Sequence, residues 1–295
     1  MSFRDRIQAV NQYDFSGFRP FRVAGVRVGS VRHAFAATLT RWPDVFAVTT
    51  TAINLAPTLD TPPVRTAALQ AVLLQLRDEG LIRHWRNELY PVNRYFAEPP
   101  YLLLERAAAP WFGLCAYGVH LNGFVRTAQG IEMWLGRRAR DKPGEPGKLD
   151  QLVAGGQPAG LGLHANLLKE CWEEAGIPAA LAARAVPVGA VSYCRETPQG
   201  LRPDVLFVYD LELPPDFSPV NQDGEVEAFL RWPLARVLTT VRDTDAFKLN
   251  CALVVIDFLI RHGSIPPEQP DYLALLHGLR ARETALAEAR RLYPE

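Results

Sequence analysis

The sequence predicts an α+β protein in which a mixed sheet lies between helices. Strand-like and helical stretches are intermixed after residue 115, and the last third of the chain is helical in pattern at 247–262 and 272–292. Packing a sheet against helices is the usual way for strands and helices in this order to bury their apolar faces. With 295 residues the chain is long enough for two domains. We expect a smaller α+β domain at 1–114 and the main domain, with the C-terminal helices, at 115–295.

The first domain is predicted from short patterns. Alternating or β-branched stretches at 21–29 and 45–51 predict strands, and apolar residues at helical spacing predict one amphipathic helix at about 64–79. Residues 85–92 follow and are dense in aromatic and hydrogen-bonding side chains. They form either a wall of a binding site or a set of buried, satisfied polar groups at a domain seam.

The second half of the chain carries the strands of the predicted sheet. Its alternating stretches predict strands at 117–125, 131–137, 149–154, 186–194, 205–213 and 228–232. Residues 137–147 are rich in proline, glycine and charge, so they predict a loop.

Composition excludes several function classes. The formal net charge is zero, so no bulk charge favours nucleic acid or an anionic membrane surface as a partner. Four well-separated cysteines form no Cys-x-x-Cys pair, which argues against a structural zinc and against a disulfide framework. The first residues show no apolar signal core, and the apolar run at 252–260 is too short to span a bilayer. We therefore expect a cytoplasmic protein.

The most informative stretch is 155–177. On a helix Glu170, Glu173 and Glu174 share one face, because they are related by i, i+3 and i+4. Like charges in this arrangement repel by roughly 0.2–0.5 kcal/mol per pair. A divalent cation such as Mg²⁺, which prefers carboxylate oxygens, would offset that repulsion. The alternative is an ordinary solvated acidic face.

The ends and the back of this helix support the metal interpretation. Gly176 suits a left-handed C-terminal cap, and the pair Gly155-Gly156 suits a backbone that approaches a metal or a phosphate closely. The opposite face is apolar and would pack against a core. Its residues are Leu163, Leu167, Leu168, Cys171, Trp172 and Ala175.

These residues resemble the Nudix box. Its pattern is Gly, five residues, Glu, seven residues, Arg-Glu, an aliphatic residue, any residue, Glu-Glu, any residue, Gly and an aliphatic residue. The matching positions are Gly155, Glu170, Glu173, Glu174, Gly176 and Ile177. Three positions depart from the pattern, with Leu161 for the first glutamate, Lys169 for the arginine and Cys171 for the aliphatic residue.

The resemblance implies an α/β/α sandwich with a mixed sheet and hydrolysis of a diphosphate that depends on Mg²⁺ or, as a substitute, Mn²⁺. In that reading Glu173, Glu174 and the Gly155 carbonyl hold the metal. Glu170 orients or deprotonates the attacking water or binds a second metal. A downstream glutamate often completes such a site, and Glu225 or Glu227 could serve, although both could equally belong to a surface turn.

Further residues are candidates for substrate contact. They are Tyr117, His120, Arg137, Lys148 and Gln157. The basic ones could contact the diphosphate or simply be solvated, and His120 could equally make a structural hydrogen bond.

Four longer stretches, at 85–92, 117–123, 155–160 and 247–263, resemble one Nudix subgroup. Its members carry an extra N-terminal domain and are related to fungal thiamine pyrophosphokinase proteins. The resemblance implies cleavage of thiamine diphosphate, or its oxo- and oxy-forms, to the monophosphate. The alternative substrates are nucleoside diphosphates linked to another moiety, such as ADP-ribose, NADH or a damaged nucleotide. A Nudix-fold binding module without catalysis would predict loss of the three box glutamates, which are all present. The oligomeric state is left open.

Overall fold

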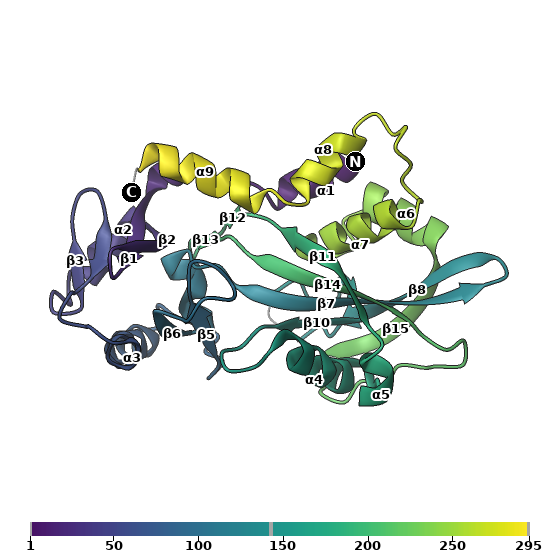
Figure 1. Cartoon of the computed structure of the whole chain (residues 1–295), viewed down its shortest axis with the longest axis horizontal. Coiled ribbons are helices and arrows are strands. Elements are labelled where there is room, and N and C mark those ends of the chain that lie inside the picture. The colour runs from purple at the N-terminus through teal and green to yellow at the C-terminus, as the bar shows by residue number, and fades with distance from the viewer. Residues whose placement is uncertain (1, 142–143, 294–295) are drawn as a thin grey trace.

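The computed structural model describes residues 2–141 and 144–293. The α+β class with mixed sheets is confirmed: one large sheet lies between two helical layers, and a smaller sheet lies beside it (Figure 1). The helices of the described residues are α1 (Phe3–Ala9), α2 (His33–Leu39), α3 (Pro62–Asp78), α4 (Leu163–Ala175), α5 (Ala179–Ala182), α6 (Leu234–Asp243), α7 (Leu249–Arg261), α8 (Tyr272–Gly278) and α9 (Arg282–Leu292). Two 3-10 turns are η1 (Phe15–Gly17) and η2 (Arg106–Phe112).

The smaller sheet has the strand order β2-β1-β4-β3. Its strands are β1 (Phe18–Val23), β2 (Val26–Arg32), β3 (Phe46–Val48) and β4 (Ile53–Leu55). The pair β5 (Leu89–Val92) and β6 (Leu102–Glu105) lies beside it, and the predicted helix at 64–79 is confirmed as α3. The buried side of α3, which includes Leu69, Leu73 and Leu76, packs into this part of the core.

The large sheet has the order β11-β14-β7-β8-β15, with β10 paired to β7 and β9 paired to β8. Its strands are β7 (Tyr117–Thr127), β8 (Gly130–Arg138), β9 (Leu149–Gln151), β10 (Val153–Gly156), β11 (Val186–Ser192), β14 (Val205–Glu212) and β15 (Val226–Pro233). Strands β7 and β14 are parallel and the other pairs are antiparallel, so the sheet is mixed. A short pair, β12 (Arg195–Glu196) and β13 (Leu201–Arg202), stands apart.

Alternation along β7 decides which helix each side chain meets. Val119 and Leu121 face the layer of α4 and α5, whereas Phe124 faces the layer of α7. Helix α7 is buried along nearly its whole length, and α4 presents only one buried face. The sheet therefore has one deeply covered face and one face that carries the box helix.

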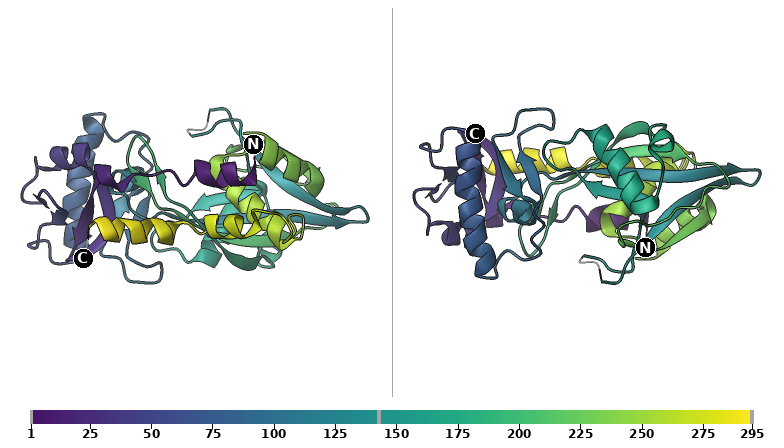
Figure 2. Two further views of the ribbon diagram at one scale, coloured as in Figure 1. Left: turned by 90° about the horizontal axis from the view of Figure 1, so that it is seen from above. Right: turned by 90° about the horizontal axis from the view of Figure 1, so that it is seen from below.

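The two ends of the chain each pack on the other half of the molecule. Helix α1 packs through Phe3 and Ile7 against the core beneath α7 and α8, while α9 packs through Ala285 and Ala289 against Phe15 of the N-terminal segment (Figures 1 and 2). The division at residue 114 stays a prediction.

The sequence predicted one helix over 272–292, which is wrong because the chain breaks between α8 and α9. Gly278 ends α8 against α1, where an added Cβ would lie 2.5 Å from a methyl carbon of Ile7. The Ala281 N–H then donates to the Ser192 carbonyl of the large sheet at 3.1 Å. Among the described residues, no helix combines the length and the apolar character needed to cross a membrane.

Candidate active site

Helix α4 ends as its sequence predicts. Gly176 adopts a left-handed conformation with φ of 62°, and an added Cβ would lie 2.9 Å from the Val220 carbonyl oxygen. The Ile177 N–H donates to the Cys171 carbonyl at 3.0 Å, which closes the last turn. The glycine therefore fixes where the acidic face stops.

The back of α4 packs on the sheet, with one exception. Leu167, Cys171 and Ala175 are almost fully buried there, and Leu163 and Leu168 are partly buried. The predicted place of Trp172 in this face is wrong, because its side chain is 55% exposed. The side chains of Cys171 and Ala175 face the strands, so the Trp172 side chain between them in the helix points away from the sheet.

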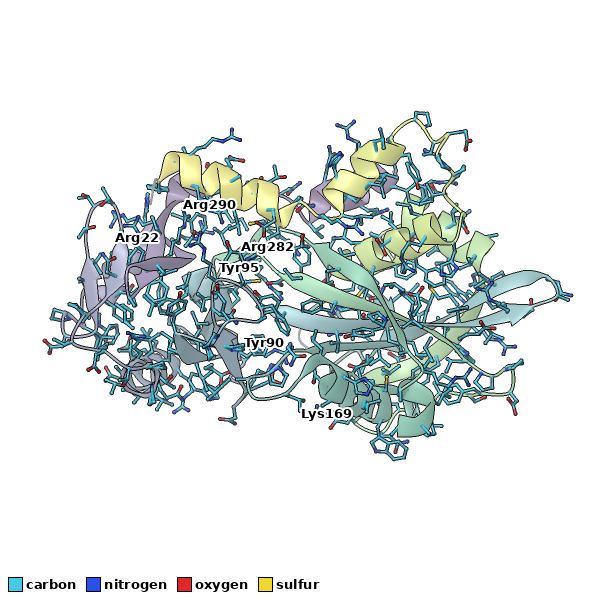
Figure 3. The ribbon with its side chains drawn as sticks, in the orientation of Figure 1. Arg22, Tyr90, Tyr95, Lys169, Arg282 and Arg290 are labelled. Atoms are coloured by element: carbon cyan, nitrogen blue, oxygen red, sulfur yellow. The ribbon has the colours of Figure 1, made fainter. Side chains whose placement is uncertain are left out.

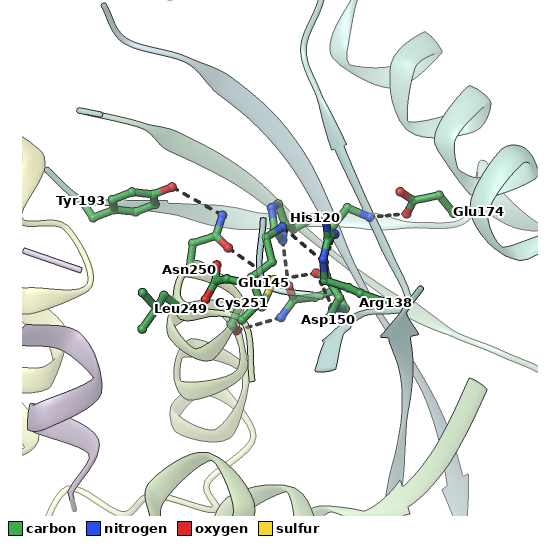
Figure 4. Close-up of polar contacts among 12 residues, drawn as sticks. His120, Arg138, Glu145, Asp150, Glu174, Tyr193, Leu249, Asn250 and Cys251 are labelled. Atoms are coloured by element: carbon green, nitrogen blue, oxygen red, sulfur yellow. Dashed lines mark hydrogen bonds and ion pairs between the residues drawn. The ribbon is translucent and has the colours of Figure 1, made fainter. Parts of the chain in front are cut away.

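Glu174 is the most buried of the box carboxylates. Its Oε2 accepts a hydrogen bond from the Ala154 N–H of β10 at 2.7 Å, and the residue is 8% exposed (Figure 4). Burial raises the pKa of Glu174 to about 8, against the lowering effect of that hydrogen bond. The carboxylates of Asp150, Glu170 and Asp223 raise this pKa further.

Glu170 lies directly over the first glycine of the box. An added Cβ at Gly155 would stand 2.6 Å from Glu170 Oε2, so this contact requires glycine. Burial also raises the pKa of Glu170, and the ammonium of Lys169, 3.2 Å away, partly offsets that effect. Two of the three box carboxylates are thus held against the backbone of β10.

Glu173 lies at the edge of this group. Its side chain is 41% exposed and its Oε2 is 2.6 Å from Lys169 Nζ. Lys169 therefore bridges Glu170 and Glu173 and relieves the repulsion that the sequence predicts for this face. A lysine does this as a point charge, without the fixed fork of an arginine.

The downstream acidic turn is brought to the end of α4 by backbone hydrogen bonds. The Gln222 N–H donates to the Glu173 carbonyl at 2.9 Å. Within the turn, Asp223 is the acid whose charge raises the pKa of Glu174. Of the two predicted candidates, Glu227 lies 3.8 Å from Arg140 with its side chain 41% exposed, and the carbonyl of Glu225 accepts the Ala139 N–H at 3.1 Å.

Comparison with known proteins decides the family. Nudix hydrolase 20, chloroplastic, of Arabidopsis thaliana is 46% identical over 275 residues, which cover 90% of this chain and 74% of that protein. Nudix hydrolase 24, chloroplastic, of the same plant is 47% identical over 265 residues, with coverage of 89% and 73%. This chain belongs to the Nudix hydrolase family. It is an enzyme of the class that hydrolyses diphosphate bonds.

Two other comparisons describe parts of this Nudix hydrolase. A family model described as a domain of unknown function (DUF4743) matches residues 2–116. The NUDIX domain of NrtR from Shewanella oneidensis, crystallised with ADP ribose, is 17% identical with a TM-score of 0.40, and the match covers 51% of this chain and 90% of that one. A likeness at this level carries no argument about substrate.

The expected cytoplasmic location is contradicted by these relatives. The two Arabidopsis proteins, at 46% and 47% identity, are both named as chloroplastic.

Nudix hydrolases generally use a divalent metal, and the box residues here fit one. Glu174 is a buried carboxylate and Glu170 a partly buried one, and burial raises the pKa of both. A divalent cation between them would favour their charged forms.

A second set of metal-ligating side chains lies on the other face of the sheet. Among the described residues, His120, Asp150 and Cys251 are the group of three whose ligand atoms lie within 4.8 Å of one another, and all are buried (Figure 4). Asp150 is already paired with Lys248 at 3.2 Å and Arg138 at 3.1 Å. These two cations neutralise the only carboxylate of the set, so the cluster is poorly suited to a divalent ion.

His120 therefore lies apart from the box. Its Nδ1 is 2.8 Å from Gln151 Oε1, the residue is 3% exposed, and burial lowers its pKa to about 4. The structural hydrogen bond that the sequence analysis weighed for it is present.

The two basic residues that the sequence predicts near the diphosphate make other contacts in the structure. Lys148 pairs with Asp245 at 3.1 Å, and Arg137 donates to the Gly147 carbonyl at 3.3 Å. Both contacts lie around the 138–148 segment and the start of α7. Direct contact of either side chain with a diphosphate stays a prediction.

Tyr117 and Gln157 lie next to the glycine strand. The Gln157 N–H donates to the Tyr117 carbonyl at 2.8 Å, and the Gln157 side chain is buried, where its Oε1 accepts from Asn166 at 3.1 Å. The Tyr117 ring packs at 4.9 Å from Phe96 and 6.1 Å from Phe207. Gln157 thus shapes the loop before α4, and Tyr117 belongs to an aromatic cluster beside it.

The N-terminal half reaches this site through two residues that the sequence analysis did not single out. An added Cβ at Gly156 would lie 2.0 Å from Tyr90 Oη and 3.2 Å from Arg106 Cζ, so both side chains rest on the second box glycine. Tyr90 is labelled in Figure 3. Arg106 also pairs with Glu88 at 2.7 Å, and the charge of Glu88 raises the pKa of Glu170. The dense stretch at 85–92, which contains Tyr90, was the available signal for this contact. Its role as a wall of the binding site stays a prediction.

Proposed function

We propose that this Nudix hydrolase is a Mg²⁺-dependent pyrophosphohydrolase, with Mn²⁺ as a substitute. In this proposal it cleaves the diphosphate of thiamine diphosphate, or of its oxo- and oxy-forms, to the monophosphate and phosphate. The observation that carries the proposal is the meeting of Glu170 and Glu174 on β10 beside Tyr90 and Arg106. A diphosphate site is thereby bordered by an aromatic ring and a guanidinium from the N-terminal half.

The roles follow from burial and position. Glu173, Glu174 and the Gly155 carbonyl would hold the metal, which supplies neutralising charge for the diphosphate. Glu170, partly buried and with a raised pKa, would orient the attacking water or accept its proton. Arg106 is suited to an oxygen of the diphosphate, because guanidinium pairs well with phosphate oxygens.

The ring-binding part of the proposal rests on the aromatic cluster. Phe96 lies 4.9 Å from Tyr117 and 4.7 Å from Phe207, and Tyr117 is tied to the glycine loop through Gln157. Such a cluster suits the stacking of a heteroaromatic ring. The preference for thiamine over a nucleotide is supported by the stretches at 85–92, 117–123, 155–160 and 247–263, which resemble the thiamine-related subgroup.

We also propose the division into an N-terminal domain at 1–114 and a Nudix domain at 115–295. In this proposal the N-terminal domain contributes to substrate binding, which the contacts of Tyr90 and Arg106 with Gly156 support.

The test is turnover of a substrate panel by the purified protein with Mg²⁺. The panel holds thiamine diphosphate, its oxo- and oxy-forms, ADP-ribose and NADH, and products are separated by chromatography. Preference for the thiamine compounds, lost in Glu173→Gln, is the expected result. Preference for ADP-ribose or NADH would replace the thiamine assignment with the nucleotide alternative.

A further inference from the structure

The loop that joins β10 to α4 is held from three sides. On the side of the large sheet, the Gln157 N–H donates to the Tyr117 carbonyl of β7 at 2.8 Å. On the side of the N-terminal half, the Ala159 N–H donates to the Leu89 carbonyl of β5 at 2.8 Å. The third side is the beginning of α4, where Asn166 lies. The loop is thus fixed by the sheet, by the N-terminal half and by the helix that follows it.

Asn166 is 0% exposed, and its side chain donates to this loop twice. Its Nδ2 donates to the Gly156 carbonyl at 2.8 Å and to Gln157 Oε1 at 3.1 Å. Gln157 is 2% exposed, and its Nε2 donates in turn to the Leu161 carbonyl. The orientation of the Asn166 amide is fixed, because the reverse orientation would place its oxygen against two acceptors. The two side-chain amides therefore form one chain of hydrogen bonds across the loop.

The peptide bond that follows the second box glycine is bound on both sides. Its carbonyl accepts from Asn166 and its N–H donates to the Tyr117 carbonyl, each at 2.8 Å. One residue earlier lies Gly155, where an added Cβ would stand 2.6 Å from Glu170 Oε2. A shift of this peptide would therefore move the backbone on which the Glu170 carboxylate rests.

Packing alone does not explain an asparagine at this position. Its Oδ1 is buried without a hydrogen-bond partner among the described residues, and an unpaired buried acceptor costs stability. An apolar side chain would avoid that cost but would supply neither donor. Leu161, moreover, stands where the box pattern has a glutamate, so the loop has no side-chain carboxylate at that point. Its main-chain carbonyl is held by Gln157 instead.

We propose that Asn166, acting through the Gly156 carbonyl, is a positioning residue for hydrolysis. It holds the backbone beneath Glu170, so that this carboxylate keeps its place relative to the attacking water, and it does not touch the substrate itself. The inference rests on the proposed function in assigning Glu170 to the water. Arg106 has its own partner, Glu88 at 2.7 Å, and does not depend on Asn166. Loss of Asn166 should therefore lower kcat and leave KM nearly unchanged.

The test compares variants of the full chain. Asn166→Ala removes both donors, Gln157→Ala removes the second amide, and a double variant removes the whole chain of hydrogen bonds. Asn122→Ala is the matched control, because Asn122 is 1% exposed, donates to Asp210 at 3.0 Å and also has a buried Oδ1 without a partner among the described residues. It lies on the other face of the sheet, where Asp210 pairs with Arg261 of α7. Urea unfolding at pH 7 establishes that each variant is folded.

Steady-state kinetics are measured with Mg²⁺ and the compound of the panel that is cleaved fastest. Asn166→Ala should lower kcat at least about tenfold and change KM less than about threefold. Gln157→Ala should lower kcat about fivefold, and the double variant should match Asn166→Ala within about twofold, because members of one network are not additive. Asn122→Ala should change kcat less than about twofold.

Two kinetic results would overturn the inference. One is an unchanged kcat in a folded Asn166→Ala protein, and the other is an equal loss of kcat in Asn166→Ala and Asn122→Ala. If Asn166→Ala does not fold, Gln157→Ala takes its place in both comparisons.

Binding of Mn²⁺ needs no substrate, so it separates this inference from the proposed function. Followed by electron paramagnetic resonance, Mn²⁺ affinity should fall about tenfold in Asn166→Ala and less than about twofold in Asn122→Ala, since groups that hold a metal site in place affect its affinity. If no compound of the panel is cleaved, the proposed function fails and this titration decides. Equal Mn²⁺ affinity in the wild type and Asn166→Ala would then overturn the inference.

Discussion

Replacing Glu174 by glutamine should make the metal-free protein more stable. The carboxyl is 8% exposed, and burial raises its pKa from an ordinary 4.5 to about 8. Because the folded pKa is raised, the unfolded chain ionises first, and the folded state loses stability as pH climbs from 4.5 toward 8. The interval from pH 4.5 to pH 7 is about 2.5 pH units. At 1.36 kcal/mol per unit, the buried carboxyl lowers the free energy of unfolding at pH 7 by about 3 kcal/mol.

The glutamine variant removes that cost and keeps the local contacts. Its amide oxygen can still accept the Ala154 N–H, and the neutral amide is not repelled by the charges of Asp150, Glu170 and Asp223. Glu173→Gln is the matched control, since that side chain is 41% exposed and its loss should change stability by less than about 0.5 kcal/mol.

The assay is urea unfolding in EDTA at pH 7 and pH 5, followed by the same titration with Mg²⁺. We expect Glu174→Gln to exceed the wild type by about 3 kcal/mol at pH 7 and by under about 1 kcal/mol at pH 5. Mg²⁺ should stabilise the wild type but not the variant. A Glu174→Gln protein that is no more stable than wild type at pH 7 in EDTA would show that burial does not raise the pKa of Glu174 in this way.

Three further predictions concern single positions. Gly155→Ala should lower kcat at least about tenfold, because the new methyl group would overlap Glu170. Steady-state kinetics would show this, with Gly17→Ala as the control, because a Cβ at Gly17 would meet no atom within 4 Å. An unchanged kcat would count against the glycine contact. Arg106→Gln should raise KM for the diphosphate substrate about tenfold, with a smaller change in kcat, because one charged hydrogen bond to the substrate is lost. An unchanged KM would show that Arg106 does not bind the substrate. Burial lowers the pKa of His120 to about 4, so the unfolded chain takes up the proton first as the pH falls. The free energy of unfolding should therefore drop by about 3 kcal/mol between pH 6.5 and pH 4. Unfolding curves of His120→Gln should lack this pH-dependent loss of stability.

Local sequence information predicted the box helix well. The spacing of Glu170, Glu173 and Glu174, the left-handed Gly176 and the buried side of α3 are all set by residues within a few turns of one another. Helical periodicity says which residues share a face. It does not say which part of that face is covered, and Trp172 was placed wrongly for this reason.

Contacts between distant segments could not be predicted in this way. Tyr90 and Arg106 meet Gly156, and Gly278 ends a helix against Ile7, only because segments far apart in the chain are brought together. Neither the periodicity of a helix or strand nor the spacing of a motif encodes contacts of this kind. The burial of His120 is a further case, since an alternating strand pattern leaves open which face of the sheet meets α7.

We propose that the box carboxylates, and not the buried cluster on the other face of the sheet, hold the divalent metal. Titration with Mn²⁺, followed by electron paramagnetic resonance of the free ion, tests it in wild type, Glu173→Gln and Cys251→Ser. We expect Glu173→Gln to weaken Mn²⁺ binding by about tenfold or more and Cys251→Ser to leave it unchanged. Retention of Mn²⁺ affinity in Glu173→Gln together with its loss in Cys251→Ser would assign the metal to the buried cluster instead of the box.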